Sequence, residues 1–119
     1  AVAKAEEFFV SALGSLMRAG FSPSNVYLDP GIGFGKTAQG NLALLRQTPV
    51  LAQIGQVAIG LSRKSFLGTC FGVTEMISRD PVSHALEIAA VWLGAKLVRT
   101  HDVKGFVTAW RGGLVPANG

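Results

Sequence analysis

The chain has 119 residues, of which 49% are hydrophobic and 15% are charged, with a formal net charge of +4. This length allows one hydrophobic core, and the composition excludes a disordered tail. The basic residues are scattered, with Arg63 and Lys64 the only adjacent pair, which argues against a nucleic-acid partner. The apolar stretches are far shorter than the roughly 20 residues of a membrane-spanning helix. We expect one globular domain without a membrane partner.

The beginning of the chain predicts a helix and then a short strand. Apolar side chains recur at helical spacing between residues 4 and 19, and Gly20 stands where a helix would end. Residues 26–28 (VYL) are apolar and bounded by loop residues, which predicts a buried parallel strand ending at Asp29. Because no strand precedes the helix, we expect the chain to be part of a longer protein.

The middle of the chain predicts a loop, a helical segment and a second strand. Glycines throughout residues 30–36 argue against regular structure there. A helical segment is expected from about Asn41, with Pro49 interrupting or restarting it. Residues 57–61 (VAIGL) predict a second buried strand, which runs directly into residues 62–65 (SRKS).

The C-terminal part predicts a helix, a third strand and a last helix. Asp80 followed by Pro81 is typical of an N-cap with proline at the first helical position, and this helix should extend to Gly94. Residues 97–100 (LVRT) predict a third short strand. Asp102 should then cap the last helix.

Helices and strands therefore alternate, with crossovers long enough to return each strand parallel to the one before it. The predicted class is α/β with a parallel sheet. Polar side chains fall at the C-terminal ends of the three strands: Asp29, Ser62, Lys64, Arg99 and His101. In parallel α/β folds this edge of the sheet is where ligands bind.

The glycine-rich segment at residues 31–37 is similar to two phosphate-binding loops but matches neither pattern. A P-loop needs a glycine where Pro30 stands, and proline also lacks the N–H that such a loop uses. A dinucleotide-binding fingerprint needs its third glycine where Lys36 stands. The segment is therefore interpreted as a backbone-rich loop beside the carboxylate of Asp29.

Taken singly, the residues at this edge leave two interpretations open. Asp29 before Pro30 is either a turn-forming aspartate or a bidentate acceptor for an amidine-like edge, such as that of a pterin. Lys64 is equally ambiguous, because an isolated lysine is usually a solvated surface charge. Arg99 ends an apolar strand, where a charge needs a partner or a ligand.

Arg99 and His101 lie two residues apart, so an extended strand places them on the same side. Such a pair suits a diphosphate, since arginine offers a planar fork of donors and histidine can also donate. The alternative is an arginine with a structural carboxylate partner and a core histidine. His84, within the third helix, is interpreted as structural.

The sequence indicates no covalent catalyst. No Ser-His-Asp arrangement and no ligand spacing typical of zinc is present, and the single Cys70 is interpreted as a small buried hydrophobe in a protein of a reducing compartment such as the cytoplasm. Any catalysis would act through binding, orientation and charge stabilisation.

Three segments together resemble the dihydropteroate synthase family. They are residues 28–36 (LDPGIGFGK), 60–68 (GLSRKSFLG) and 98–103 (VRTHDV), and their order and spacing match the family as well. The resemblance implies a (β/α)8 TIM-type barrel, of which residues 1–119 would be the C-terminal segment with the last three strands and their helices. The five earlier strands would belong to the missing part of the protein.

The resemblance also implies a reaction and a role for each polar residue. The reaction joins a dihydropterin diphosphate to 4-aminobenzoate in folate biosynthesis, with loss of diphosphate. Asp29 and Lys64 would hold the pterin, and Arg99 and His101 would hold the diphosphate. A separate set would border the 4-aminobenzoate site, where sulfonamides compete: Phe34, Ser62 and Ser65.

The resemblance further implies Mg²⁺ on the diphosphate, held by a residue of the missing N-terminal half, and a homodimer formed by the full-length protein. Two alternatives remain open. One is a non-catalytic half-barrel that needs a partner chain. The other is a different pterin-binding barrel, such as a methyltetrahydrofolate methyltransferase, although the Arg99 and His101 pair argues against it because a methyl donor carries no diphosphate.

Overall fold

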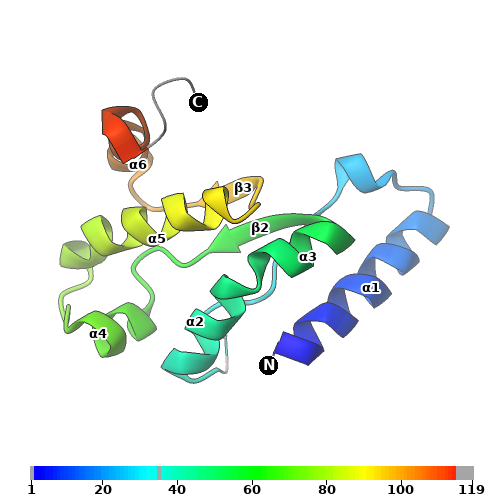
Figure 1. The fold of residues 1–119 in the computed structure, drawn as a ribbon, viewed down its shortest axis with the longest axis horizontal. Helices are drawn as coiled ribbons and strands as arrows, with labels where there is room; N and C mark the ends of the chain where they lie inside the picture. The colour runs from blue at the N-terminus through cyan, green and yellow to red at the C-terminus, as the bar shows by residue number, and fades with distance from the viewer. Residues whose placement is uncertain (1, 35, 115–119) are drawn as a thin grey trace.

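The computed structural model describes residues 2–34 and 36–114, in which helices and strands alternate (Figure 1). The α-helices are α1 Val2–Arg18, α2 Ala38–Arg46, α3 Thr48–Ile54, α4 Ser65–Phe71, α5 Asp80–Trp92 and α6 Val103–Ala109. The strands are β1 Tyr27–Leu28, β2 Gln56–Gly60 and β3 Leu97–Arg99. Short helical turns at Pro23–Asn25, Ile77–Arg79 and Trp110–Leu114 complete the described chain. None of the helices in these ranges is long and apolar enough to cross a membrane.

The three strands form one sheet in the order β1-β2-β3, and both pairings are parallel. Tyr27 pairs with Gln56, and Gly60 pairs with Arg99. The expected parallel α/β architecture is therefore confirmed. The central strand β2 is buried from Val57 to its end, whereas Tyr27 of β1 is 47% exposed. β1 is thus buried on one face only, which corrects the expectation of a fully buried strand.

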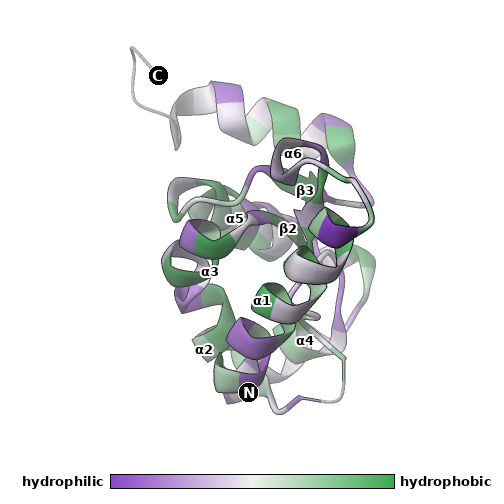
Figure 2. Ribbon diagram, turned by 90° about the vertical axis from the view of Figure 1, so that its right-hand side faces the viewer, coloured by the Kyte–Doolittle hydropathy of each residue, from purple (hydrophilic) through white to green (hydrophobic). Residues whose placement is uncertain are grey.

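The hydrophobic core lies between the helices and β2. Helix α5, which contacts β3, is coloured mainly as hydrophobic in Figure 2. The largest fully buried apolar side chains of the core come from α1, the glycine-rich loop, α2, α3, β2, the turn after β2 and α4: Phe9, Ile32, Leu44, Leu51, Ile59, Leu61 and Leu67. Ile32 anchors the glycine-rich loop in this core. The loop is therefore fixed at the edge of the sheet although it has no regular structure.

One helix differs from the expectation in its starting point, and one further helix was not expected. α2 begins at Ala38 and not near Asn41, because the side chain of Thr37 caps it by accepting a hydrogen bond from the Gly40 N–H at 2.9 Å. The restart at Pro49 is confirmed, since α3 begins with this proline in its first turn. The short helix α4 was not expected; it follows Lys64 directly and has too few residues to show a clear period.

Asp80 does not act as the N-cap of α5, which corrects the sequence expectation. It is the first residue of the helix, and Arg79 before it already has helical backbone angles. The carboxylate of Asp80 instead accepts two hydrogen bonds from Arg63, at 2.8 and 3.0 Å. Pro81 lies in the first turn as expected. Asp80 therefore forms a tertiary ion pair with Arg63 in place of the local hydrogen bond of an N-cap.

A buried polar network joins α5 to α6. His84 Nδ1 lies 3.0 Å from Glu87 Oε1, and His84 Nε2 lies 3.1 Å from Asp102 Oδ2. Asp102 also caps α6 as expected, accepting a hydrogen bond from the Gly105 N–H. The ring of Phe106 packs edge-on against His84, with 6.2 Å between the ring centroids. His84 thus holds the start of α6 against α5, in line with its structural interpretation.

This network shifts the pKa values of its members. Burial alone would lower the pKa of His84, but hydrogen bonds to Glu87 and Asp102 outweigh it and raise that pKa. Burial raises the pKa of Glu87, whose second oxygen finds no hydrogen-bond partner in the described part of the chain. The hydrogen bond from His84, followed by the one from the Gly105 N–H, lowers the pKa of Asp102. The network therefore favours a protonated His84.

The first prediction concerns the pH dependence of stability. Because folding raises the pKa of His84, its contribution is complete below the unfolded value of about 6.5 and is lost as pH rises through the folded value. Urea unfolding between about pH 6 and 9 should show stability falling with pH, and His84→Gln should flatten this slope. His101→Gln should leave the slope unchanged, because His101 is not part of the network of His84, Glu87 and Asp102. An unchanged slope in His84→Gln would contradict the assignment.

The second prediction concerns the core. Phe9→Ala should lower the free energy of unfolding by about 3 kcal/mol, because Phe9 is fully buried and its removal leaves a cavity. Phe8→Ala provides a matched control at the adjacent position, where the side chain is 52% exposed, and should cost less than about 1 kcal/mol. Equal losses in the two variants would show that α1 does not dock as described.

Candidate ligand-binding site

The C-terminal edge of the sheet forms a pocket of about 240 Å³. Its lining comes from the glycine-rich loop, the end of β2 with the turn after it, and the end of β3 with the segment after it: Phe34, Gly60, Ser62, Lys64, Arg99, Thr100 and His101. Parallel pairing brings these segments together, because the carboxyl ends of all three strands meet at one edge. Five of the seven predicted site residues line this pocket.

Asp29 reaches the same pocket through an ion pair. Its Oδ2 accepts a hydrogen bond from Arg99 Nη2 at 2.6 Å, and its Oδ1 accepts one from the Gly31 N–H at 2.8 Å. The pair spans from the end of β1 to the end of β3. The side chain of Arg99 is 62% exposed, so the pair is open to solvent and to a ligand. The structure therefore gives Arg99 the carboxylate partner that its position at the end of a strand requires.

Lys64 lies against the glycine-rich loop. Its Nζ donates a hydrogen bond to the Ile32 carbonyl at 2.5 Å and stands 4.4 Å from the centre of the Phe34 ring. A Cβ on Gly33 would lie 2.5 Å from Lys64 Cδ, so any larger residue at position 33 would force the lysine side chain to move. Burial lowers the pKa of Lys64, and the nearby charge of Arg99 adds to this, while Asp29 opposes it. Lys64 is thus an ordered, partly buried cation and not a freely solvated one.

Ser62 fixes the segment that follows β3. Its buried hydroxyl oxygen accepts a hydrogen bond from the His101 N–H at 3.0 Å and lies 2.9 Å from His101 Nδ1. Thr100 Oγ1 donates to the same oxygen at 3.4 Å. Because Ser62 occupies Nδ1, the Nε2 atom of the His101 ring is left for a ligand. Sequence reasoning placed Ser62 beside a ligand and did not find this contact between β2 and β3.

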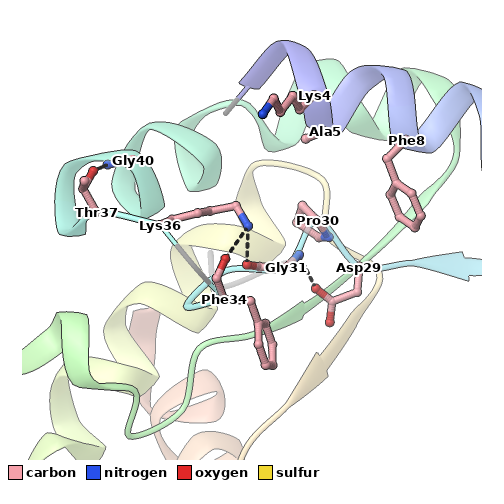
Figure 3. Close-up of a pocket in the computed structure, with 10 residues that line it drawn as sticks. All are labelled: Lys4, Ala5, Phe8, Asp29, Pro30, Gly31, Phe34, Lys36, Thr37 and Gly40. Atoms are coloured by element: carbon pink, nitrogen blue, oxygen red, sulfur yellow. Dashed lines mark hydrogen bonds between the residues drawn. The ribbon is translucent and has the colours of Figure 1, made fainter.

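A second, larger pocket of about 610 Å³ adjoins the first, and Figure 3 shows its lining. The start of α1 faces the glycine-rich loop across it, with Phe8 opposite Asp29 and Phe34. Lys36 donates to the carbonyls of Gly31 and Phe34, at 2.8 and 3.1 Å, and so closes the loop on itself. Asp29 and Phe34 therefore face a continuous space beside the first pocket.

Ser65 is the one predicted residue that neither pocket includes; its side chain is exposed at the start of α4.

Within residues 2–34 and 36–114, no group of three or more His, Cys, Asp or Glu side chains is arranged to hold a metal ion. The site instead gathers Lys64, Arg99 and His101 along one pocket, and Arg99 contacts the carboxylate of Asp29. Such a set suits an anionic ligand with an adjoining hydrogen-bond donor edge better than it suits a cation.

Comparison with protein families matches residues 1–101 to the family described as pterin binding enzyme. Among curated proteins, the chain is 40% identical over 110 residues to the dihydropteroate synthase of Neisseria meningitidis serogroup C, covering 91% of this chain and 39% of that protein. The chain thus spans about 40% of the length of this curated relative.

Solved structures agree with this comparison. The dihydropteroate synthase of Stenotrophomonas maltophilia, with imidazole bound in its active site, superposes with a TM-score of 0.87 at 37% identity, covering 92% of this chain and 42% of that one. The Xanthomonas albilineans enzyme with 7,8-dihydropteroate gives a TM-score of 0.86 at 35% identity, covering 93% of this chain and 44% of that one. The same fold and the same family thus emerge from sequence and from structure. The chain belongs to the pterin-binding enzyme family, and its relatives there are dihydropteroate synthases.

Proposed function

We propose that this chain is the C-terminal segment of a dihydropteroate synthase, which condenses 6-hydroxymethyl-7,8-dihydropterin diphosphate with 4-aminobenzoate to give 7,8-dihydropteroate and diphosphate. The observation that carries the proposal is the convergence of one carboxylate and three basic side chains at one sheet edge: Asp29, Lys64, Arg99 and His101. A pterin diphosphate presents the complementary groups, a donor edge and an anionic tail, on one molecule.

Asp29 and Lys64 would bind the pterin. The carboxylate of Asp29 lines the larger pocket and contacts Arg99 of the smaller one, and it can accept hydrogen bonds from the amino group and ring N–H of the heterocycle. The Nζ atom of Lys64 lies 4.4 Å from the centre of the Phe34 ring and can donate to the acceptor atoms of the pterin. Both side chains are already ordered by the protein, which reduces the entropic cost of binding.

Arg99 and His101 would bind the diphosphate. Arg99 ends β3 and His101 lies two residues further along the chain, and the guanidinium of Arg99 is exposed enough to form a bidentate contact with phosphate oxygens. His101 would present its Nε2 atom, because Ser62 occupies Nδ1. The charges on these residues would also stabilise the diphosphate as it leaves.

The proposed chemistry needs no nucleophile from the protein. The bond between the pterin methylene carbon and the diphosphate oxygen breaks, and its electron pair leaves with the diphosphate. The amino nitrogen of 4-aminobenzoate then forms a bond to the methylene carbon and releases a proton. The part of the protein described here would position the two reactants and stabilise the leaving anion.

Phe34, Ser62 and Ser65 would border the 4-aminobenzoate site, as the resemblance to the family implies. The exposed ring of Phe34 is shared by both pockets and offers an apolar face to the aromatic substrate. Ser65 begins the helix next to Lys64 and lies outside the pocket lining. Ser62 would contribute mainly through His101, since its hydroxyl is already engaged.

In this proposal, residues 1–119 supply the last three strands of a (β/α)8 barrel in a cytoplasmic homodimer. Mg²⁺ would accompany the diphosphate and be held by a residue outside this chain, because the basic groups gathered here do not suit a cation. A half-barrel without activity of its own is the second candidate. The exposed side chain of Tyr27 on β1 favours it, because it leaves one face of this strand open to a partner.

The third prediction concerns activity. This chain alone should form no dihydropteroate from the dihydropterin diphosphate, 4-aminobenzoate and Mg²⁺, because the remaining strands of the barrel are required to close the site. Addition of the N-terminal part of a dihydropteroate synthase relative should restore product formation, measured by chromatography. If the two parts assemble and no product forms, the synthase proposal is wrong and the half-barrel becomes the better assignment.

The fourth prediction separates the two halves of the site. In the assembled protein, Arg99→Ala should weaken binding of inorganic diphosphate by about tenfold or more, since a charge-assisted contact is lost. Lys64→Ala should weaken binding of a pterin more than binding of diphosphate, as measured by calorimetry. Lys96→Ala, an exposed lysine at the opposite end of β3, is the control and should change neither. Equal effects of all three would refute the assigned roles.

A further inference from the structure

The turn after β2 contains a backbone conformation that its residue type disfavours. Arg63 has φ of +58°, and among the described residues it is the one non-glycine residue with positive φ. It stands third in a turn closed by a hydrogen bond from the Lys64 N–H to the Leu61 carbonyl at 3.2 Å. Glycine or asparagine usually occupies this position. A strained conformation persists only where surrounding contacts enforce it, often at functional sites.

Three neighbours enforce the conformation of Arg63. Its N–H donates to the buried Ser83 Oγ at 3.1 Å, and its guanidinium forms two hydrogen bonds with Asp80. Its carbonyl accepts a hydrogen bond from Arg79 Nη1 at 2.9 Å. Arg79 in turn donates to two carbonyls of the loop between α4 and α5. Arg63 is therefore tied to the start of α5 through its N–H, its carbonyl and its side chain.

The residues on either side of Arg63 reach the two other loops of the site. Ser62 contacts His101 after β3, and Lys64 contacts Ile32 in the glycine-rich loop after β1. The turn thus links all three loops at the edge of the sheet. A rotation of this turn would move both contacts together, because only Arg63 separates the two residues.

We propose that Arg63 is a positioning residue for the ligand site, a role that rests on the function proposed above. The left-handed backbone of Arg63 sets the directions in which the side chains of Ser62 and Lys64 point. Its contacts with Asp80 and Ser83 hold this turn in place. Glycine would suit the backbone but could not form the ion pair, which accounts for an arginine at a strained position. Arg63 itself does not line the pocket.

The test measures the ring nitrogens of His101 by NMR in the 119-residue chain without ligand. Ser62→Ala defines the change in Nδ1 chemical shift that follows loss of the Ser62 contact. Arg63→Ala should shift the Nδ1 resonance in the same direction, and Arg46→Ala, an exposed arginine on α2, should not. Asp80→Asn and Ser83→Ala each remove one anchor and should act as Arg63→Ala does, so the test does not depend on one variant folding.

Binding measurements in the assembled protein provide the second readout. Arg63→Ala should weaken binding of both inorganic diphosphate and a pterin by about tenfold, since both halves of the site lose alignment. An unchanged His101 spectrum in folded Arg63→Ala, Asp80→Asn and Ser83→Ala would overturn the proposal. If the spectrum changes while the unsubstituted protein binds neither probe, the positioning role stands and the proposed function fails.

Discussion

The parallel pairing of β2 with both of its neighbours is the constraint on which the rest of the structure depends. It brings the ends of three strands, separated by long stretches of sequence, to one edge of the sheet. Burial of consecutive residues of β2 on both faces stabilises this arrangement, because the strand is apolar along its length and is covered on each side. Asp29, Ser62 and Arg99 meet only because each follows or ends one of these strands.

Hydrogen bonds then convert this proximity into a defined site. Asp29 with Arg99, Lys64 with Ile32, and Ser62 with His101 each join loops that follow different strands. Arg63, which contacts Ser83 of α5, and His84 of α5, which contacts Asp102, support the loops after β2 and β3. The site is therefore ordered before any ligand binds, although every residue in it belongs to a loop or to the end of a strand.

Much of the architecture and the gathering of polar residues could be predicted from the sequence, because strand ends and helix caps are local signals. The roles of Asp80 and Ser62 could not, since their partners lie 17 to 39 residues away along the chain. The helix α4 is too short to show a period, and the strain at Arg63 depends on tertiary contacts alone. Local patterns located the site, and long-range hydrogen bonds determined what each residue does there.

The ion pair between Asp29 and Arg99 has a thermodynamic consequence for selectivity. Under the proposed roles, a ligand with only a pterin or only a diphosphate would separate the pair and leave one charge uncompensated. A molecule that carries both groups satisfies both charges at once, so its two parts should bind cooperatively. Under the same proposed roles, departure of the diphosphate would let Asp29 and Arg99 pair again, which would favour release of the product over rebinding.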